Sequence, residues 1–217
     1  MTKITLLNLA ALAFMLVFQA ACNSITESGP INDSLEPVAE VAFISGTENT
    51  VLTVNRSQES YFSLDFSNVG SNSVIEDGIG EGWCIDWQKP IDSDGGVYND
   101  ISLYSTFSVE KWNPLNFLLN IKEQLKNSDP EITYREIQLV IWSLQGFPEF
   151  DLDTVELSDL PGRMLQDGEA AFNADKVDQI LQIVEAGYRD FAFIEGTKFA
   201  VIAETPADVQ TVITVAQ

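Results

Sequence analysis

The alternation of apolar and polar residues divides the chain into β-rich ends and a helical middle. Residues 50–54, 60–69, 82–86 and 97–107 alternate or run apolar and are rich in β-branched and aromatic side chains, a pattern typical of strands. Similar patterns return near the end of the chain in "DFAFIEG", "KFAVIAE" and "VQTVITVA". We therefore expect strands in both halves, with the last strand pairing with earlier ones.

The centre of the chain changes to a helical period. Asn113 and Pro114 provide an N-cap and a first helical residue for "LNFLLNIKEQL". A second helix begins at the capping box of Thr133 and Glu136, and a third is predicted over residues 174–186. Together these elements predict a single α+β domain, β-rich and sandwich-like or barrel-like, with a central helical segment.

Residues 1–21 predict an export signal peptide. An apolar run over 4–18 follows the basic Lys3 and is too short for a comfortable membrane-spanning helix. The sequence "QAAC", which ends at Cys22, resembles a bacterial lipoprotein cleavage site, although Gln19 replaces the usual leucine. This resemblance implies a cell-envelope lipoprotein, attached to a membrane through lipid on Cys22, at the outer membrane and exposed on the surface. The alternative is an ordinary cleaved signal in which Cys22 is incidental.

The remaining chain is expected to consist of an acidic lipidated linker over residues 22–40 and one domain over residues 41–217. Loss of residues 1–21 removes Lys3 and no acidic residue, so 33 acidic residues face 10 basic ones and the net charge is −23. Such a surface repels nucleic acid and anionic lipid, which excludes both as partners. We expect a monomer, since this surface also disfavours self-association.

The chain contains no histidine, which excludes Ser–His–Asp and Cys–His catalysis together with His-ligated metal sites. Beyond the signal peptide only Cys22 and Cys84 carry sulfur as thiol. With Cys22 lipidated, a single cysteine is left, and structural zinc is excluded too. No metal and no cofactor are predicted.

The second helix places an amide beside its apolar face. Gln138 lies at the border of that face, next to Trp142, where an amide is costly to bury unless a partner satisfies it. The apolar stripe itself consists of Ile137, Val140, Ile141 and Leu144.

Two stretches together resemble the thioester domains of bacterial surface adhesins. "WCID" contains Cys84, and "IQLVIW", tens of residues later on a predicted helix, contains Gln138. In that family a cysteine sulfur and a glutamine side-chain carbonyl form an internal thioester with loss of ammonia. The resemblance covers roughly residues 45–215. It implies that Cys84 is the thiol, that Gln138 is the acyl donor, and that the protein attaches covalently to an amine-bearing target.

The chemistry of such a bond fits the residues around it. A thioester needs contact between thiol and amide and a site dry enough to slow hydrolysis. Trp83 and Trp142 flank the two partners and are expected to shield them, and Asp86 follows the thiol closely enough to orient the site. The thioester would react once with an amine such as a lysine side chain. Because the protein would not turn over, we do not expect it to be an enzyme.

Two other functions stay open. The first is a non-covalent binding lipoprotein with Cys84 as a buried core residue. The second is a hydrolase, which the missing histidine disfavours and which would require chemistry between Cys84 and Asp86. The glycine-rich stretch 78–82 and the "DSDGG" stretch 92–96 are expected to be turns, and the acidic segment 147–172 has no assigned role.

Overall fold

The computed structural model describes residues 38–217, which belong to one compact unit. The predicted signal peptide, Cys22 and most of the predicted linker lie outside the described residues. Within residues 38–217 no helix has the length and apolar character needed to cross a membrane.

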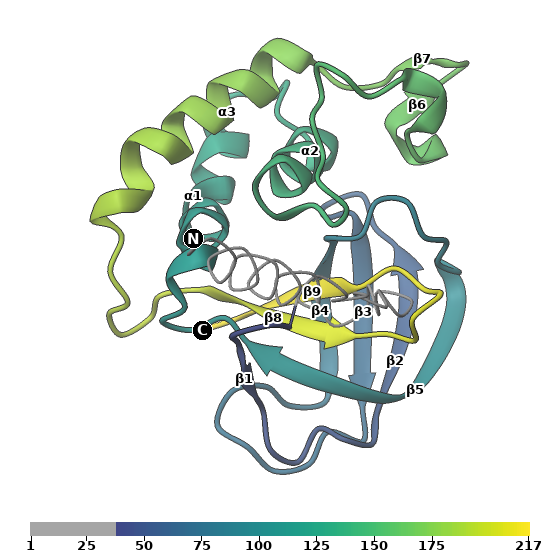
Figure 1. Ribbon diagram of the computed structural model, residues 1–217, viewed down its shortest axis with the longest axis vertical. Coiled ribbons are helices and arrows are strands. Elements are labelled where there is room, and N and C mark those ends of the chain that lie inside the picture. Colours follow the sequence, from purple (N-terminus) through teal and green to yellow (C-terminus); the bar gives the residue numbers. More distant parts are fainter. Residues whose placement is uncertain (1–37) are drawn as a thin grey trace, which may run out of the picture. The chain divides into compact units, whose positions relative to one another are not determined.

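Antiparallel strands close into a six-stranded barrel in the described chain (Figure 1). The strand order is β5-β2-β3-β4-β9-β8, and β8 pairs again with β5. The predicted α+β class with a β-rich body is confirmed, and the closed barrel takes the place of a sandwich. The strands are β2 (Thr50–Arg56), β3 (Phe62–Ser67), β4 (Gly78–Cys84), β5 (Asp94–Ser105), β8 (Phe199–Glu204) and β9 (Val212–Ala216), with β1 (Ala42–Phe43) added to the end of β5 and a separate hairpin of β6 (Leu165–Gln166) and β7 (Glu169–Ala170).

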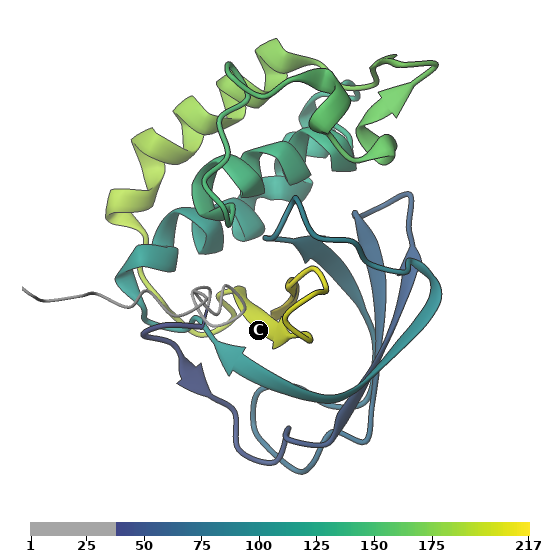
Figure 2. The ribbon, with the colours of Figure 1, turned by 45° about the vertical axis from the view of Figure 1, so that its right-hand side comes forward.

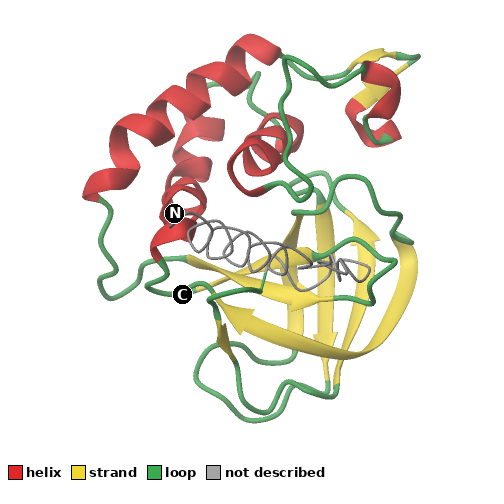
Figure 3. Ribbon diagram, in the orientation of Figure 1, coloured by secondary structure: helices red, strands yellow, loops and turns green. Residues whose placement is uncertain are grey.

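The predicted helices lie between β5 and β8 in the sequence and pack together beside the barrel (Figures 2 and 3). The first begins one residue earlier than expected, and the other two begin as predicted. They are α1 (Asn113–Ser128), α2 (Tyr134–Gln145) and α3 (Ala174–Gly187), accompanied by the short 3-10 helices η2 (Glu110–Trp112), η3 (Leu157–Asp159), η4 (Gly162–Met164) and η5 (Tyr188–Asp190).

The residue pattern of each strand depends on whether one or both of its faces are covered by other parts of the protein. In β2 and β3, residues such as Leu52 and Leu64 are buried while their neighbours are more exposed, which gives the alternation expected of a strand with one solvent face. In β8 the run Phe199–Ala203 is buried throughout. Because α1 packs against β8, this strand has no solvent face and its sequence loses the alternation.

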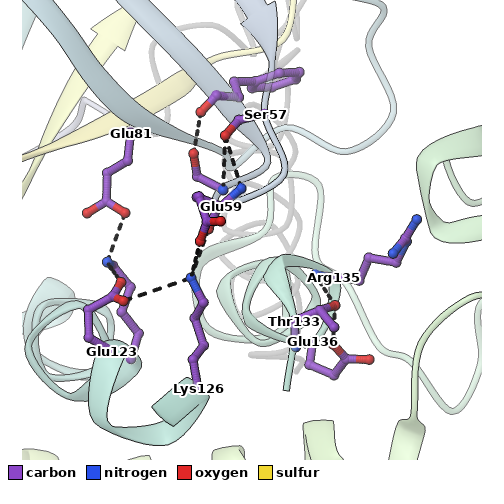
Figure 4. Close-up of polar contacts among 11 residues, drawn as sticks. Ser57, Glu59, Glu81, Glu123, Lys126, Thr133, Arg135 and Glu136 are labelled. Carbon is purple, nitrogen blue, oxygen red and sulfur yellow. Dashed lines mark hydrogen bonds and ion pairs between the residues drawn. The ribbon is translucent and has the colours of Figure 1, made fainter. Parts of the chain in front are cut away.

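A buried lysine joins α1 to β4, the strand that carries Cys84. Lys122 is 2% exposed, and its Nζ lies 2.8 Å from Glu81 Oε2 and 2.6 Å from Glu123 Oε1 (Figure 4). A buried charge is tolerated only when it is paired in this way. The ion pairs therefore fix where the helices sit relative to β4.

Glu136 connects two helix starts. Its Oε2 accepts hydrogen bonds from the Thr133 N–H at 2.7 Å and the Thr133 hydroxyl at 2.6 Å, which confirms the predicted capping box of α2 (Figure 4). Its Oε1 accepts from the Asn173 N–H at 2.9 Å, just before α3. Both carboxylate oxygens are therefore used in the folded protein.

Replacing this carboxylate is expected to loosen both helix starts. Glu136→Gln should lower the free energy of unfolding by about 2 kcal/mol, because an amide cannot accept all three bonds. Urea denaturation measures the change. Asp178→Asn is the control, since Asp178 is exposed on α3 and makes no polar contact among the described residues; an equal effect of both variants would contradict the assigned role.

The glycine-rich stretch 78–82 forms part of β4, so its prediction as a turn is wrong. A Cβ atom on Gly82 would lie 2.4 Å from Leu64 Cγ, and one on Gly80 would lie 2.6 Å from Thr214 Oγ1. The missing side chains of these glycines leave room for the side chains of Leu64 and Thr214 against β4. In the sequence alone, such a run of glycines looks the same as a turn.

Two further differences arise from the barrel. In "DSDGG" an Asp92 side chain accepts from the Asp94 N–H, but β5 already begins at Asp94 and contains a register shift there. The stretch "DFAFIEG" forms no strand. Both edges of β8 are occupied by β5 and β9, so the closed barrel leaves no edge beside β8 for it. Its Phe191 and Phe193 instead pack against each other on the surface.

Candidate functional site

The structure places Gln138 against the backbone of Cys84, 54 residues earlier in the chain. The Cys84 N–H donates to Gln138 Oε1 at 2.9 Å, and Gln138 Nε2 donates to the Cys84 carbonyl at 2.7 Å. Both residues are 0% exposed. Gln138 is thus fully enclosed, not at the edge of a helix face, and its amide has a partner on both sides.

The position of this amide follows from where β3 begins. Gly82 of β4 pairs with Phe62, the first residue of β3, so β3 supplies no partner for Cys84 two residues further on. On the other side the Ile85 N–H bonds to Thr211 and continues the contact with β9. The Gln138 side chain therefore completes the hydrogen bonding of β4 in place of β3, and carries α2 onto the end of that strand.

The Cys84 thiol is shielded from water and protonated. Its Sγ donates to the Asp86 carbonyl at 2.7 Å. Burial raises the pKa of the Cys84 thiol far above its ordinary value, and the nearby indole of Trp142 opposes this rise. That indole nitrogen makes no hydrogen bond of ordinary geometry within residues 38–217.

An aromatic layer covers the pair. Tyr61 packs edge-on against Trp142 at a ring distance of 5.7 Å, and Phe150 lies between Trp142 and Trp87 at 5.5 and 5.3 Å. Burial, followed by the neighbouring Cys84, raises the pKa of Tyr61. None of these four rings is more than 9% exposed, so water has little access to the site.

Trp83 occupies the other side of β4. Successive strand residues point to opposite faces, so Trp83 and Cys84 diverge. Trp83 shares its face with Glu81, the partner of Lys122 on α1, and is 0% exposed. The shielding that we predicted for Trp83 would therefore act from the helix-covered face of the strand, while Trp142 lies beside the thiol.

The Asp86 side chain turns to a different partner. Its Oδ2 lies 2.8 Å from Lys89 Nζ, while only its backbone carbonyl meets the Cys84 thiol. Asp86 is 1% exposed, so the ion pair neutralises a buried charge. The contact between thiol and carboxylate that a hydrolase would use is not made in the described chain. Asp86 thus orients the thiol through its main chain.

Sequence reasoning missed the contribution of the segment 147–172. Its Phe150 completes the aromatic layer, and its Arg163 stacks over Tyr61 at 4.7 Å. The sequence contained a signal for each: Phe150 is an aromatic residue shortly after the helix that carries Gln138, and Arg163 is the one arginine in an acidic segment. Among residues 38–217 no group of histidine, cysteine or acidic side chains is arranged to hold a metal.

Comparison with known proteins finds no family model, no curated protein and no solved structure that matches this chain.

Proposed function

We propose that the protein carries an internal thioester between Cys84 and Gln138 and uses it to attach covalently, once, to amine groups on a target surface. The observation that carries this proposal is the paired hydrogen bonding of the Gln138 amide to Cys84 in a fully buried site. As part of the same proposal, a lipid on Cys22 would hold the domain at the outer membrane, exposed at the cell surface.

Formation of the bond exchanges an amide for a thioester. The thiol leaves the Asp86 carbonyl and Sγ attacks the side-chain carbon of Gln138; the S–C bond forms, the C–N bond breaks, and the thiol proton leaves with the nitrogen as ammonia. The Cys84 N–H lies 2.9 Å from Gln138 Oε1, where it would stabilise negative charge that develops on that oxygen. The rest of the rate would come from holding the thiol and the amide in the same buried site.

Attack by a target amine opens the thioester and forms a new amide bond to Gln138. The amine nitrogen bonds to the Gln138 carbonyl carbon, the C–S bond breaks, and the amine proton returns to the sulfur. The target is then joined to Gln138, and Cys84 becomes a thiol again. The buried aromatic layer supports this reading, because a thioester exposed to water would hydrolyse before it met its target.

A second candidate is a non-covalent binding module, favoured by one observation. The thiol already has an acceptor in the Asp86 carbonyl, and the Gln138 amide already satisfies the end of β4. In that case Cys84 would be a core residue. The two candidates differ in covalent mass alone, so mass is the deciding measurement.

The intact mass of a soluble form that begins after Cys22 is expected to fall short of its sequence mass by one ammonia. Methylamine should then add its full mass, because aminolysis opens the thioester and keeps the new amide. A full sequence mass that methylamine leaves unchanged would refute the thioester and leave the binding module. A thiol reagent alone cannot decide, since burial by itself protects Cys84.

A further inference from the structure

The aromatic layer over the proposed thioester has to open before an amine can reach the bond. Cys84 and Gln138 are 0% exposed, and the rings around them are nearly as buried. An attacking nitrogen must come into contact with the Gln138 carbonyl carbon. At least one covering ring therefore moves when the bond reacts, and the rings differ in how firmly the fold holds them.

Two of the covering rings are held firmly. Trp142 belongs to α2 and is 0% exposed. Tyr61 lies directly before β3, and the Arg163 guanidinium stacks over its ring at 4.7 Å and over the Tyr134 ring at 4.8 Å. The Arg163 carbonyl in turn accepts from Arg135 Nε at 2.8 Å. Moving either ring would therefore break contacts of a helix or a strand.

Residues 148–160, which carry the third ring on Phe150, are held much more loosely. Only Phe150 and Leu160 of this segment are buried. Within the described chain, every hydrogen bond of residues 149–160 joins two residues of that same stretch. A segment with few buried side chains and no hydrogen bonds to the rest of the fold opens at a low cost in free energy.

Hollows along Trp87 leave this segment room to move. One has a volume of about 460 Å³ and lies between Trp87 and the residues of 149–159 that line it. Another, of about 360 Å³, is also lined by Trp87. The indole meets the segment through a hydrogen bond from Nε1 to the Pro148 carbonyl at 2.9 Å and through the Phe150 ring. Releasing the segment therefore breaks few contacts with Trp87.

We propose that residues 148–160 form a flap that opens by withdrawing Phe150, and that the resulting gap admits only slender amines such as an unbranched lysine side chain. The Phe150 ring lies 5.3 Å from the Trp87 ring and 5.5 Å from the Trp142 ring, so its withdrawal leaves a gap one ring wide between two indoles. The size limit rests on the proposed thioester, whereas the flap itself can be tested on the Cys84 thiol.

Opening of the flap is measured first on the thiol. Incubation with methylamine leaves Cys84 as a thiol whether or not a thioester was present, and its alkylation by iodoacetamide is followed by intact mass in the soluble form. Phe150→Ala should speed alkylation at least about 10-fold, because the ring no longer covers the site. Phe199→Ala is the matched control, since Phe199 is 7% exposed and packs against Phe107 at the start of β8. It should change the rate less than about 2-fold, and equal rates for the two variants would overturn the flap.

Trp87→Phe tests the flap with a milder change. It keeps an aromatic ring beside Phe150 but removes the hydrogen bond to the Pro148 carbonyl, so alkylation should speed up about 5-fold. Trp112→Phe is its control, because Trp112 is 1% exposed and its indole nitrogen makes no hydrogen bond within residues 38–217. Alkylation that is unchanged in Trp87→Phe, or equally fast in both variants, would overturn the flap.

The size limit is measured on the thioester. Butylamine and cyclohexylmethylamine both carry the amino group on a CH2, but the second has a bulkier tail. The unaltered protein should react at least about 10-fold faster with butylamine, and Phe150→Ala should reduce this preference to about 2-fold while Phe199→Ala keeps it. Equal rates for both amines in the unaltered protein would overturn the size limit. No mass change with either amine would refute the thioester, whereas the alkylation rates judge the flap separately.

Discussion

Replacing Cys84 by alanine is expected to abolish covalent capture of amines and to restore the full sequence mass. Cys84 is the only cysteine among residues 38–217, and the other one, Cys22, would carry the proposed lipid. The folded barrel should persist, because the lost sulfur removes only a small buried volume and lowers the free energy of unfolding by about 1–2 kcal/mol. Intact mass after incubation with methylamine measures the loss.

The matched control is Val201→Ala. Val201 is fully buried in β8 and lies outside the contact between Cys84 and Gln138, so its truncation should lower stability by a similar amount and leave amine capture unchanged. Covalent capture that survives in Cys84→Ala would contradict the proposed chemistry, whatever the effect on stability.

Gln138→Glu is expected to cause the largest loss of stability. Made in the Cys84→Ala protein, where no covalent bond contributes, it replaces the donor Nε2 by a carboxylate oxygen that faces the carbonyl of residue 84 in a fully buried site. Burying an unpaired charge next to an acceptor should lower the free energy of unfolding by about 3–5 kcal/mol at neutral pH. Urea denaturation over a range of pH measures it.

The loss should depend on pH in a defined direction. Burial beside a carbonyl raises the pKa of the introduced carboxyl above its unfolded value. The protonated form can donate to that carbonyl, so stability is retained below the unfolded pKa and lost as pH rises through the folded one. Gln145→Glu on the same helix is the control, because Gln145 is partly exposed and its loss should be small. Equal losses for the two variants would contradict the buried pair.

The helices could be predicted because their signals are local. The capping box at Thr133 and the apolar faces of the helices sit within a few turns of the chain, and α2 and α3 begin where those signals lie. The glycines of β4 were wrongly predicted to form a turn because the requirement for glycine there is non-local. Leu64 and Thr214 come close to them only once the sheet has formed.

In the candidate site, too, the local features could be predicted from the sequence and the non-local ones could not. The border position of Gln138 on its own helix could be read from the sequence, but its full burial depends on the barrel end that α2 covers. The juxtaposition of Cys84 and Gln138 was expected from a family resemblance, since no periodicity links residues so far apart. Phe150 and Arg163 were missed because an irregular segment has no pattern that reveals which ring it will cover.

The acyl group of the proposed bond belongs to Gln138, not to Cys84, and this decides how the protein would carry mechanical load. With the target joined to Gln138 and the proposed lipid on Cys22 as anchor, tension would run through β1 to β5, α1 and the start of α2. The chain after Gln138, including β8 and β9, would close the barrel without being pulled. Because β1 is paired with β5 only at Ala42 and Phe43, it would be the first element to peel away, and would yield before the strands that surround the thiol.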